Sequence, residues 1–262
     1  MGRGEPTEFL PIWGVFLATV AVVVLAIEGG VRLGQFRRRR SEQEDRPPVG
    51  EMVAATLALL ALMLAFAFGL AASRHDVRRG LVVDEANAIG MTYLRAALLP
   101  EPHRTGVRAL LREYVDIRLE AVEPGKLRPS IRRSEELHAR LWAHAVAVGE
   151  NDPRSIVVGL FIGSLNDVID LHTKRLALGA GNRIPGTIWA ALYFVAILGT
   201  CVMGYHAGLA GSGRSLAILA LVLAFSAVMT LIADLDRPQA GMLRVSQQAM
   251  TDLRNSFMAK EP

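Results

Sequence analysis

The sequence predicts an all-α membrane protein with four transmembrane helices and a helical soluble domain inserted between spans two and three. Hydrophobic residues make up 52% of the 262 residues and charged residues 21%, whereas soluble domains average about 45–50% and about 25%. The hydrophobic excess is concentrated in four stretches, and no stretch alternates with the period of two that a strand requires. This composition excludes an ordinary soluble enzyme, a disordered regulator and a secreted disulfide scaffold.

Four uncharged stretches are long enough to cross a membrane, whose hydrocarbon core of ~30 Å needs ~20 apolar helical residues. A fifth uncharged run, residues 155–166, is shorter and is predicted to be a buried helix of the soluble domain. The predicted transmembrane helices are residues 9–34, 52–73, 187–208 and 215–235.

The chain between the second and third spans, residues 74–183, is predicted to form the soluble helical domain. No helix breaker follows the second span before Pro100, so we expect one helix from residue 52 to about residue 99, roughly 70 Å long. After the fourth span, the spacing of apolar residues predicts a C-terminal helix over residues 239–259.

The charge and cysteine content argue against several other functions. The net charge of +4 does not require a nucleic-acid partner, because Lys and Arg in membrane proteins set orientation and contact anionic lipid. The single cysteine, Cys201, has no partner for an intrachain disulfide. The six histidines lack metal-binding spacing, and no nucleophile has a base nearby in the sequence. We therefore expect no enzymatic activity, no cofactor, no metal and no nucleic-acid partner.

The orientation in the membrane has two opposing indicators. The short loop of residues 32–50 carries six arginines, which by the positive-inside rule places this loop in the cytoplasm. The soluble domain and the C-terminal tail together hold 21 of the 29 basic residues, which favours the opposite orientation. The distribution of basic residues therefore leaves both orientations open.

Polar side chains in and near the spans are candidates for an ion pathway, since polar groups in a membrane are costly. Ser226, Thr230 and Asp234 recur every four residues and share one helix face, with Asp236 just beyond. Glu85 and Asn87 lie on the extension of the second span. Each set could line a water-filled path or form hydrogen bonds and ion pairs between helices.

Small residues predict two close packing faces. One is the ridge Ala61, Ala65 and Gly69 in the second span, and the other is the pair Gly204 and Gly208 in the third span. Small residues at this spacing let two helix backbones approach closely.

Two groups of motifs resemble the bestrophin-like family of bacterial membrane proteins. The first group is Glu85-Ala-Asn-Ala-Ile-Gly90, Tyr93-Leu-Arg95 and Tyr114-Val-Asp-Ile-Arg118, and the second is Asp234-Leu-Asp-Arg-Pro238 with Gly241 shortly after. The likeness covers about residues 50–260. The signature residues are Glu85, Asn87, Gly90, Tyr93, Arg95, Tyr114, Arg118, Asp234, Asp236, Arg237, Pro238 and Gly241.

The resemblance implies a remote relation to bestrophins, which are pentameric, mostly anion-conducting channels. In bestrophins both termini and the domain between spans two and three are cytoplasmic, which would reverse the orientation that the loop of residues 32–50 favours. No bestrophin pore residue corresponds clearly to a position of this sequence, so none is transferred.

These observations predict a homo-oligomeric, bestrophin-like ion channel that crosses the bacterial inner membrane several times. Its expected partners are the lipid bilayer, inorganic ions and further copies of the chain, five in all by the resemblance. The second span would form the channel wall, with Glu85 and Asn87 as polar rings, while Asp234 and Asp236 anchor the wall or form an acidic ring. The alternative is a non-conducting, membrane-anchored interaction or sensor protein.

Overall fold

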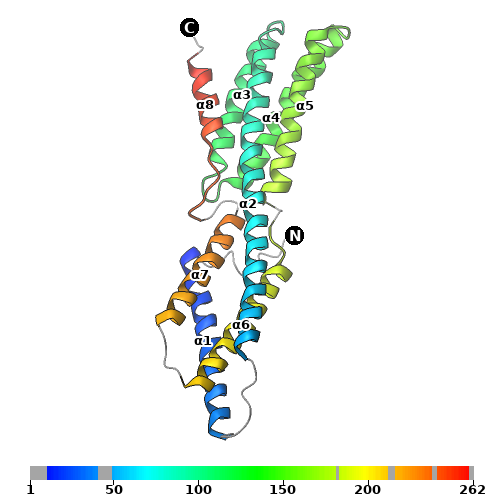
Figure 1. The fold of residues 1–262 in the computed structure, drawn as a ribbon. Helices are drawn as coiled ribbons and strands as arrows, with labels where there is room; N and C mark the ends of the chain where they lie inside the picture. The colour runs from blue at the N-terminus through cyan, green and yellow to red at the C-terminus, as the bar shows by residue number, and fades with distance from the viewer. Residues whose placement is uncertain (1–10, 41–48, 181–182, 212–215, 238–240, 260–262) are drawn as a thin grey trace. The chain divides into compact units, whose positions relative to one another are not determined.

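The structure, a computed structural model, describes residues 11–40, 49–180, 183–211, 216–237 and 241–259 (Figure 1). These residues form eight helices and no strand, which confirms the predicted all-α class. The helices are α1 Ile12–Arg40, α2 Val49–Ala96, α3 His103–Glu120, α4 Leu127–Asn151, α5 Ile156–Ala180, α6 Gly186–Ala210, α7 Leu216–Asp236 and α8 Gln248–Met258.

Five of these helices are long and apolar enough to cross a membrane by length and composition. They are α1, α2, α5, α6 and α7. The sequence predicts four spans and treats the segment of α5 as part of the soluble domain. The count of apolar helices therefore supports a membrane protein but does not confirm the four-span arrangement.

The chain divides into two compact units. Unit 1 consists of residues 1–75 and 183–243, and unit 2 of residues 76–182 and 244–262. Helix α2 belongs to both, because it continues without interruption past residue 75. This continuity follows from the absence of Gly-Pro or other breaking sequences before Pro100.

In unit 1, helices α1 and α6 pack backbone against backbone through glycines. A Cβ atom on Gly204 would overlap the carbonyl oxygen of Ile27, and one on Gly30 would overlap the carbonyl oxygen of Cys201. Gly34 and Gly208 meet in the same way one turn further along. The Gly204 packing face predicted from the sequence is confirmed, and its partner is a second glycine pair on α1.

The other predicted packing face, on α2, is not covered by any of the described residues. Ala61, Ala65 and Gly69 are all exposed, and nothing described lies within 4 Å of the position of a Cβ atom on Gly69. Buried residues on the opposite side of α2, such as Leu60 and Ala71, contribute instead to the apolar core of unit 1.

Unit 2 has its own apolar core, formed by the second half of α2 with α3, α4, α5 and α8. Two signature residues fasten helices to this core. The ring of Tyr93 stacks on Phe257 of α8 with 4.0 Å between ring centroids, and Arg95 donates a hydrogen bond of 2.8 Å to the carbonyl oxygen of Leu160 in α5. Both contacts join α2 to helices that are distant in sequence.

The predicted C-terminal helix begins too early, and the structure corrects it. Residues 239 and 240 lie outside the described residues, residues 241–247 are not helical, and α8 starts only at Gln248. The reason is a competing set of hydrogen bonds, because the amides of Met242 and Leu243 bind the Asp234 carboxylate. Gly241 has a φ of 135°, which is incompatible with a helix.

Candidate functional site

Glu85 lies at the centre of a buried charged cluster in unit 2. Its carboxylate is completely buried and forms an ion pair of 3.0 Å with the Nε atom of Arg118 on α3. Its second oxygen pairs with Arg175 on α5. Two guanidinium groups therefore surround one carboxylate, and the cluster joins α2, α3 and α5.

The hydroxyl of Tyr114 completes the contacts of this carboxylate. It donates a hydrogen bond of 2.7 Å to Glu85 and lies 3.2 Å from the Nδ1 atom of His172. Because the hydroxyl proton points to Glu85, the Nδ1 atom of His172 must donate to the hydroxyl oxygen. Burial lowers the pKa of His172 to about 4, so at neutral pH the ring carries its one proton on Nδ1 and its Nε2 atom is unprotonated.

A second histidine packs against the same group. The ring of His138 on α4 lies 4.9 Å from the ring of Tyr114 and 4.9 Å from the ring of His172 between centroids. The Nε2 atoms of His138 and His172 are buried and have no hydrogen-bond partner among the described residues. All four neighbouring helices of unit 2, α2 to α5, thus contribute a polar side chain to one buried cluster.

The environment sets the charge of each member. Burial by itself would raise the pKa of Glu85, but the charges of Arg118 and Arg175 and the Tyr114 hydroxyl bring this pKa below its usual value. Burial, assisted by the charge of Glu85, raises the pKa of Tyr114 well above 10. Burial lowers the pKa of His138 to about 4. At neutral pH the carboxylate is therefore charged, while Tyr114 and His138 are neutral.

Asn87, the other predicted polar group of α2, does not belong to this cluster. It is exposed, whereas Glu85 is completely buried. Two residues apart on a helix differ by about 200° in direction, so the two side chains point to nearly opposite sides. The hypothesis that both form polar rings on one wall is wrong for Glu85, which faces the core of its own unit.

Sequence reasoning missed three members of the cluster, His138, His172 and Arg175. A signal exists for two of them, since His172 and Arg175 are three residues apart on an otherwise apolar helix face that also carries Leu165 and Val168. Nothing in the sequence pairs that face with Glu85, which lies 90 positions away from Arg175.

The second signature is a backbone-binding site in unit 1. The buried carboxylate of Asp234 accepts the amide of Met242 at 2.9 Å and the amide of Leu243 at 2.9 Å. Asp236 accepts the amide of Ile184 at 2.8 Å, immediately before α6 begins, and its carboxylate lies 3.8 Å from Arg74 of α2. Both aspartates therefore hold chain connections in place.

The remaining polar residues of α7 are also turned inward. Ser226 is completely buried, and Thr230 donates to the carbonyl oxygen of Ser226 at 2.7 Å. The Ser226 hydroxyl has no hydrogen-bond partner among the described residues, and the Thr230 bond lies within α7. The hypothesis of a polar seam to a neighbouring helix therefore stays a prediction for Ser226 and Thr230. Arg237 follows at the end of α7, and Pro238 lies outside the described residues.

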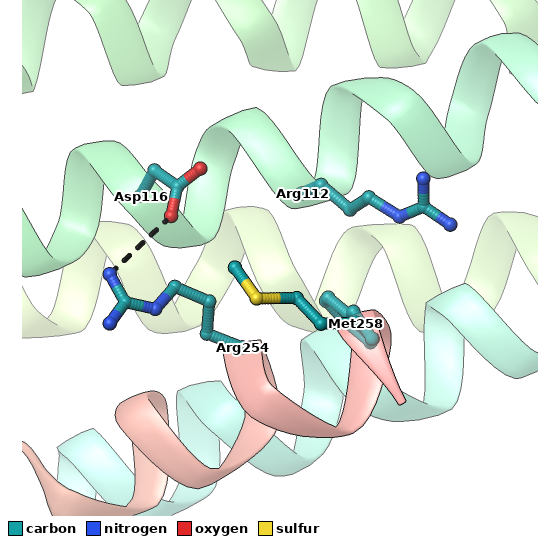
Figure 2. A pocket seen from close by; sticks show the side chains of 5 residues that line it. Arg112, Asp116, Arg254 and Met258 are labelled. Carbon is teal, nitrogen blue, oxygen red and sulfur yellow. Dashed lines mark ion pairs between the residues drawn. The ribbon is translucent and has the colours of Figure 1, made fainter. Parts of the chain in front are cut away.

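A cavity of about 210 Å³ lies in unit 2 between α3 and α8. Its lining is Arg112, Asp116, Arg254, Phe257 and Met258. In Figure 2, Asp116 and Arg254 point toward each other at one end, 3.9 Å apart, while Arg112 extends at the other end. Arg112 donates to the Tyr93 hydroxyl at 2.7 Å, so this side chain takes part in fastening α8.

The described residues offer no metal centre. Among them, no group of three or more His, Cys, Asp or Glu side chains lies close enough to hold a metal ion. The pair His103 and His144, whose Nδ1 atoms are 3.0 Å apart, has no third ligand of this kind among the described residues.

Comparisons with known proteins agree with the motifs. The chain has the fold of two solved membrane proteins, each with a TM-score of 0.65 over 94% of this chain. One is a bacterial bestrophin homologue from Klebsiella pneumoniae, 15% identical and covered over 97% of its length. The other is described as a membrane protein, 14% identical and covered over 98%.

No curated protein matches this chain. The family comparison is more specific than the structural likeness, because the family model of the bestrophin-like domain matches residues 14–250. The chain is therefore a member of the bestrophin-like family.

Proposed function

We propose that this chain is the protomer of a homo-oligomeric ion channel in the bacterial inner membrane. In this proposal α1, the first part of α2, α6 and α7 cross the membrane, and unit 2 lies outside it. The proposal involves no catalytic step and no cofactor. Membership of the bestrophin-like family supports it.

The placement of α5 outside the membrane rests on its polar residues. Its buried side carries His172 and Arg175, which belong to the cluster around Glu85. Its exposed side carries Asp167 and Asp170. Exposed carboxylates are costly in hydrocarbon, so α5 fits a soluble helical bundle better than a lipid-facing span.

The observation that carries the proposal is a continuous exposed stripe along α2. Positions spaced by three or four residues share one helix face, and along this face nine positions are exposed and one, Gly80, is half-buried. The stripe consists of Leu62, Ala65, Gly69, Ser73, Asp76, Gly80, Val83, Asn87, Met91 and Leu94.

A ring of identical protomers would turn this stripe into a wall. In a cyclic oligomer each copy presents the same face to the axis. The middle of the stripe is small or polar, at Gly69, Ser73 and Asp76, which suits a hydrated path. Leu62 near one end and Leu94 near the other suit apolar constrictions of the kind that gate channels.

The two signature clusters have a supporting role in this proposal. Glu85 lies on the side of α2 opposite to the stripe, where its ion pairs hold α3 and α5 against α2. Asp234 and Asp236 bind backbone amides. These carboxylates are therefore anchors, and Asp76 and Asn87 are the polar groups proposed to face the ions.

Planar-bilayer recording of the purified full chain tests the proposal. We expect currents whose reversal potential in a salt gradient shifts when the charge on the stripe changes, in opposite directions for Asp76→Asn and Asn87→Asp. Glu135→Gln is the matched control, since Glu135 is exposed on α4 and off the stripe, and it should leave the reversal potential unchanged.

Two outcomes would contradict the channel. Cross-linking in mild detergent that yields only monomers excludes a ring. Silence across ions and voltages from an intact oligomer would favour the alternative, a non-conducting membrane-anchored interaction or sensor protein.

A further inference from the structure

We propose that His103 and His144 share one proton and form an acid-sensitive contact that holds the first turn of α3 against α4. The inference concerns unit 2 alone and is independent of conduction. It rests on the contact between the two rings, on the close fit of the His144 ring against α3, and on the hydrogen bonds with which α3 begins.

The contact is made by the same atom of each ring. The Nδ1 atoms of His103 and His144 are 3.0 Å apart, and the rings meet edge to face, with 84° between their planes. This distance is within the range of a hydrogen bond from an N–H group. Because both atoms are ring nitrogens, one Nδ1 atom carries the proton and donates it, while the other accepts.

This hydrogen bond limits the number of protons that the pair can hold. Two neutral rings satisfy the bond when the donor is protonated on Nδ1 and the acceptor on Nε2. One further proton on the Nε2 atom of the donor leaves the bond intact. A second further proton turns both Nδ1 atoms into donors, and the bond is lost. The contact is therefore stable in the neutral and singly charged pair and breaks in the doubly charged pair.

The surroundings of His144 oppose its protonation. Burial lowers the pKa of His144, and the charges of His103 and Arg140 lower it further. The doubly charged pair therefore forms only as the pH falls below the ordinary histidine value of about 6.5. Next to His103 in the sequence, Glu101 and Arg104 pair with each other at 3.7 Å, so this carboxylate already has a cationic partner.

The charged residues of neighbouring elements have contacts elsewhere. Arg95 of α2 donates to the carbonyl oxygen of Leu160 at 2.8 Å, and the guanidinium of Arg108 on α3 lies 4.7 Å from the centre of the Tyr93 ring. The charged residues around the connection from α4 to α5 are exposed to solvent, namely Glu150, Asp152 and Arg154. The titratable groups at the contact are therefore the two histidines and Glu101.

Gly106 couples the His144 ring to the position of α3. A Cβ atom on Gly106 would lie 2.8 Å from the Cε1 atom and 2.9 Å from the Nε2 atom of His144, which is closer than van der Waals contact allows. The ring therefore packs directly on the backbone of α3, one turn after His103. Since the ring is held between Gly106 and His103, we expect the loss of the bond to separate the first turn of α3 from α4.

The first turn of α3 has its own backbone hydrogen bonds, which report such a separation. The amide of Arg104 donates to the carbonyl oxygen of Pro100 at 3.1 Å. The amide of Gly106 donates to the carbonyl oxygen of Pro102, also at 3.1 Å. The next residue, Val107, is completely buried in the core of unit 2. We therefore expect the response to acid to be confined to this turn, while the remainder of α3 stays packed.

Amide hydrogen exchange of the full chain in detergent tests the proposal, measured by mass spectrometry at pH 7.5 and pH 5 and corrected for the intrinsic effect of pH on exchange. We expect exchange at the amides of Arg104 and Gly106 to rise several-fold at pH 5, without a comparable rise in the second half of α3. His144→Asn should abolish this rise and keep the protection at pH 7.5, because the Asn amide places a hydrogen-bonding atom at the Nδ1 position but does not titrate. His206→Asn is the matched control, since His206 lies on α6 in unit 1, and it should keep the rise.

Three outcomes would overturn the proposal. One is the absence of the rise in the wild-type protein, or its persistence in His144→Asn; if Glu101→Gln removes it instead, the responsible group is the Glu101 carboxylate, which accepts the Thr105 amide at 3.3 Å. Another is loss of protection in His144→Asn already at pH 7.5, which would show that packing of the ring holds the turn. The last is a zinc ion retained by the wild-type chain and not by His144→Asn, which would show that a metal ion, rather than a proton, joins the two nitrogens.

Discussion

Gly241 and Asp234 fit together only because residue 241 has no side chain. A Cβ atom on Gly241 would overlap the Oδ1 atom of Asp234, and that carboxylate binds the amide of Met242, the next residue in the chain. The glycine and the aspartate of the second signature therefore form one structural unit, in which the backbone that follows α7 packs against a buried carboxylate and binds it.

The first prediction concerns the contact between Gly241 and Asp234. Gly241→Ala places a side chain at a φ of 135° and against the carboxylate, so we expect a loss of about 1–3 kcal/mol of stability. The measurement is the thermal unfolding midpoint of the purified protein in detergent. Gly69→Ala is the control, because space is open there, and a similar fall in both variants would contradict the assignment.

The second prediction tests the close contact of α1 and α6. Gly204→Ala forces the two backbones apart, since its Cβ atom would overlap the carbonyl oxygen of Ile27, and should cost about 1–3 kcal/mol. Gly29→Ala, on the open side of the same α1 helix, should leave the midpoint unchanged or raise it slightly. The contact is refuted if the Gly204 variant unfolds at the wild-type temperature.

The third prediction concerns the buried charge of Glu85. Glu85→Gln leaves the guanidinium groups of Arg118 and Arg175 without their carboxylate, and breaking a buried ion pair from one side costs about 3–5 kcal/mol. The double variant Glu85→Gln with Arg118→Gln should recover part of this loss, because the charge imbalance is smaller. Comparing unfolding midpoints of the single and double variants gives the coupling. Strictly additive losses would show that the two side chains act independently.

The fourth prediction is a pH dependence from His138. Its folded pKa is about 4, below the ordinary value of 6.5, so the unfolded chain binds the proton more readily. The stability from the neutral ring is complete above pH 6.5 and is lost as the pH falls toward 4, by about 2 kcal/mol at pH 5. We expect His138→Phe to flatten the dependence of the unfolding midpoint between pH 7 and pH 5. An unchanged slope in this variant would assign the acid sensitivity to other groups.

The helices of this protein were largely predictable from local sequence. The long α2 follows from the absence of a breaker before Pro100, and the end of α6 follows from Gly211, whose φ of 66° terminates the helix. The C-terminal helix was not predictable at its start. Residues 241–247 have an acceptable helical pattern. However, the amides of Met242 and Leu243 donate hydrogen bonds to the buried carboxylate of Asp234, and only folding brings these groups together.

The candidate site was predictable in part. The family resemblance named Glu85, Tyr114 and Arg118, yet it did not indicate that they touch or that Glu85 is buried. The positions of His138 and His172 in the cluster could not be predicted, because a single histidine on an apolar helix face does not indicate which residue will contact it. The contacts between them depend on how α4 and α5 pack, which no local pattern reports.

The sequence by itself determined the all-helical class, the membrane character and the family of this protein. These properties depend on composition, on apolar run lengths and on short motifs, all of which are local. The tertiary structure alone decided that Glu85 is an internal ion-pair partner, that Asp234 binds backbone, and that the stripe through Asp76 and Asn87 stays exposed. A periodic pattern shows that a helix has a buried face, but the partner of that face is chosen by packing between distant segments.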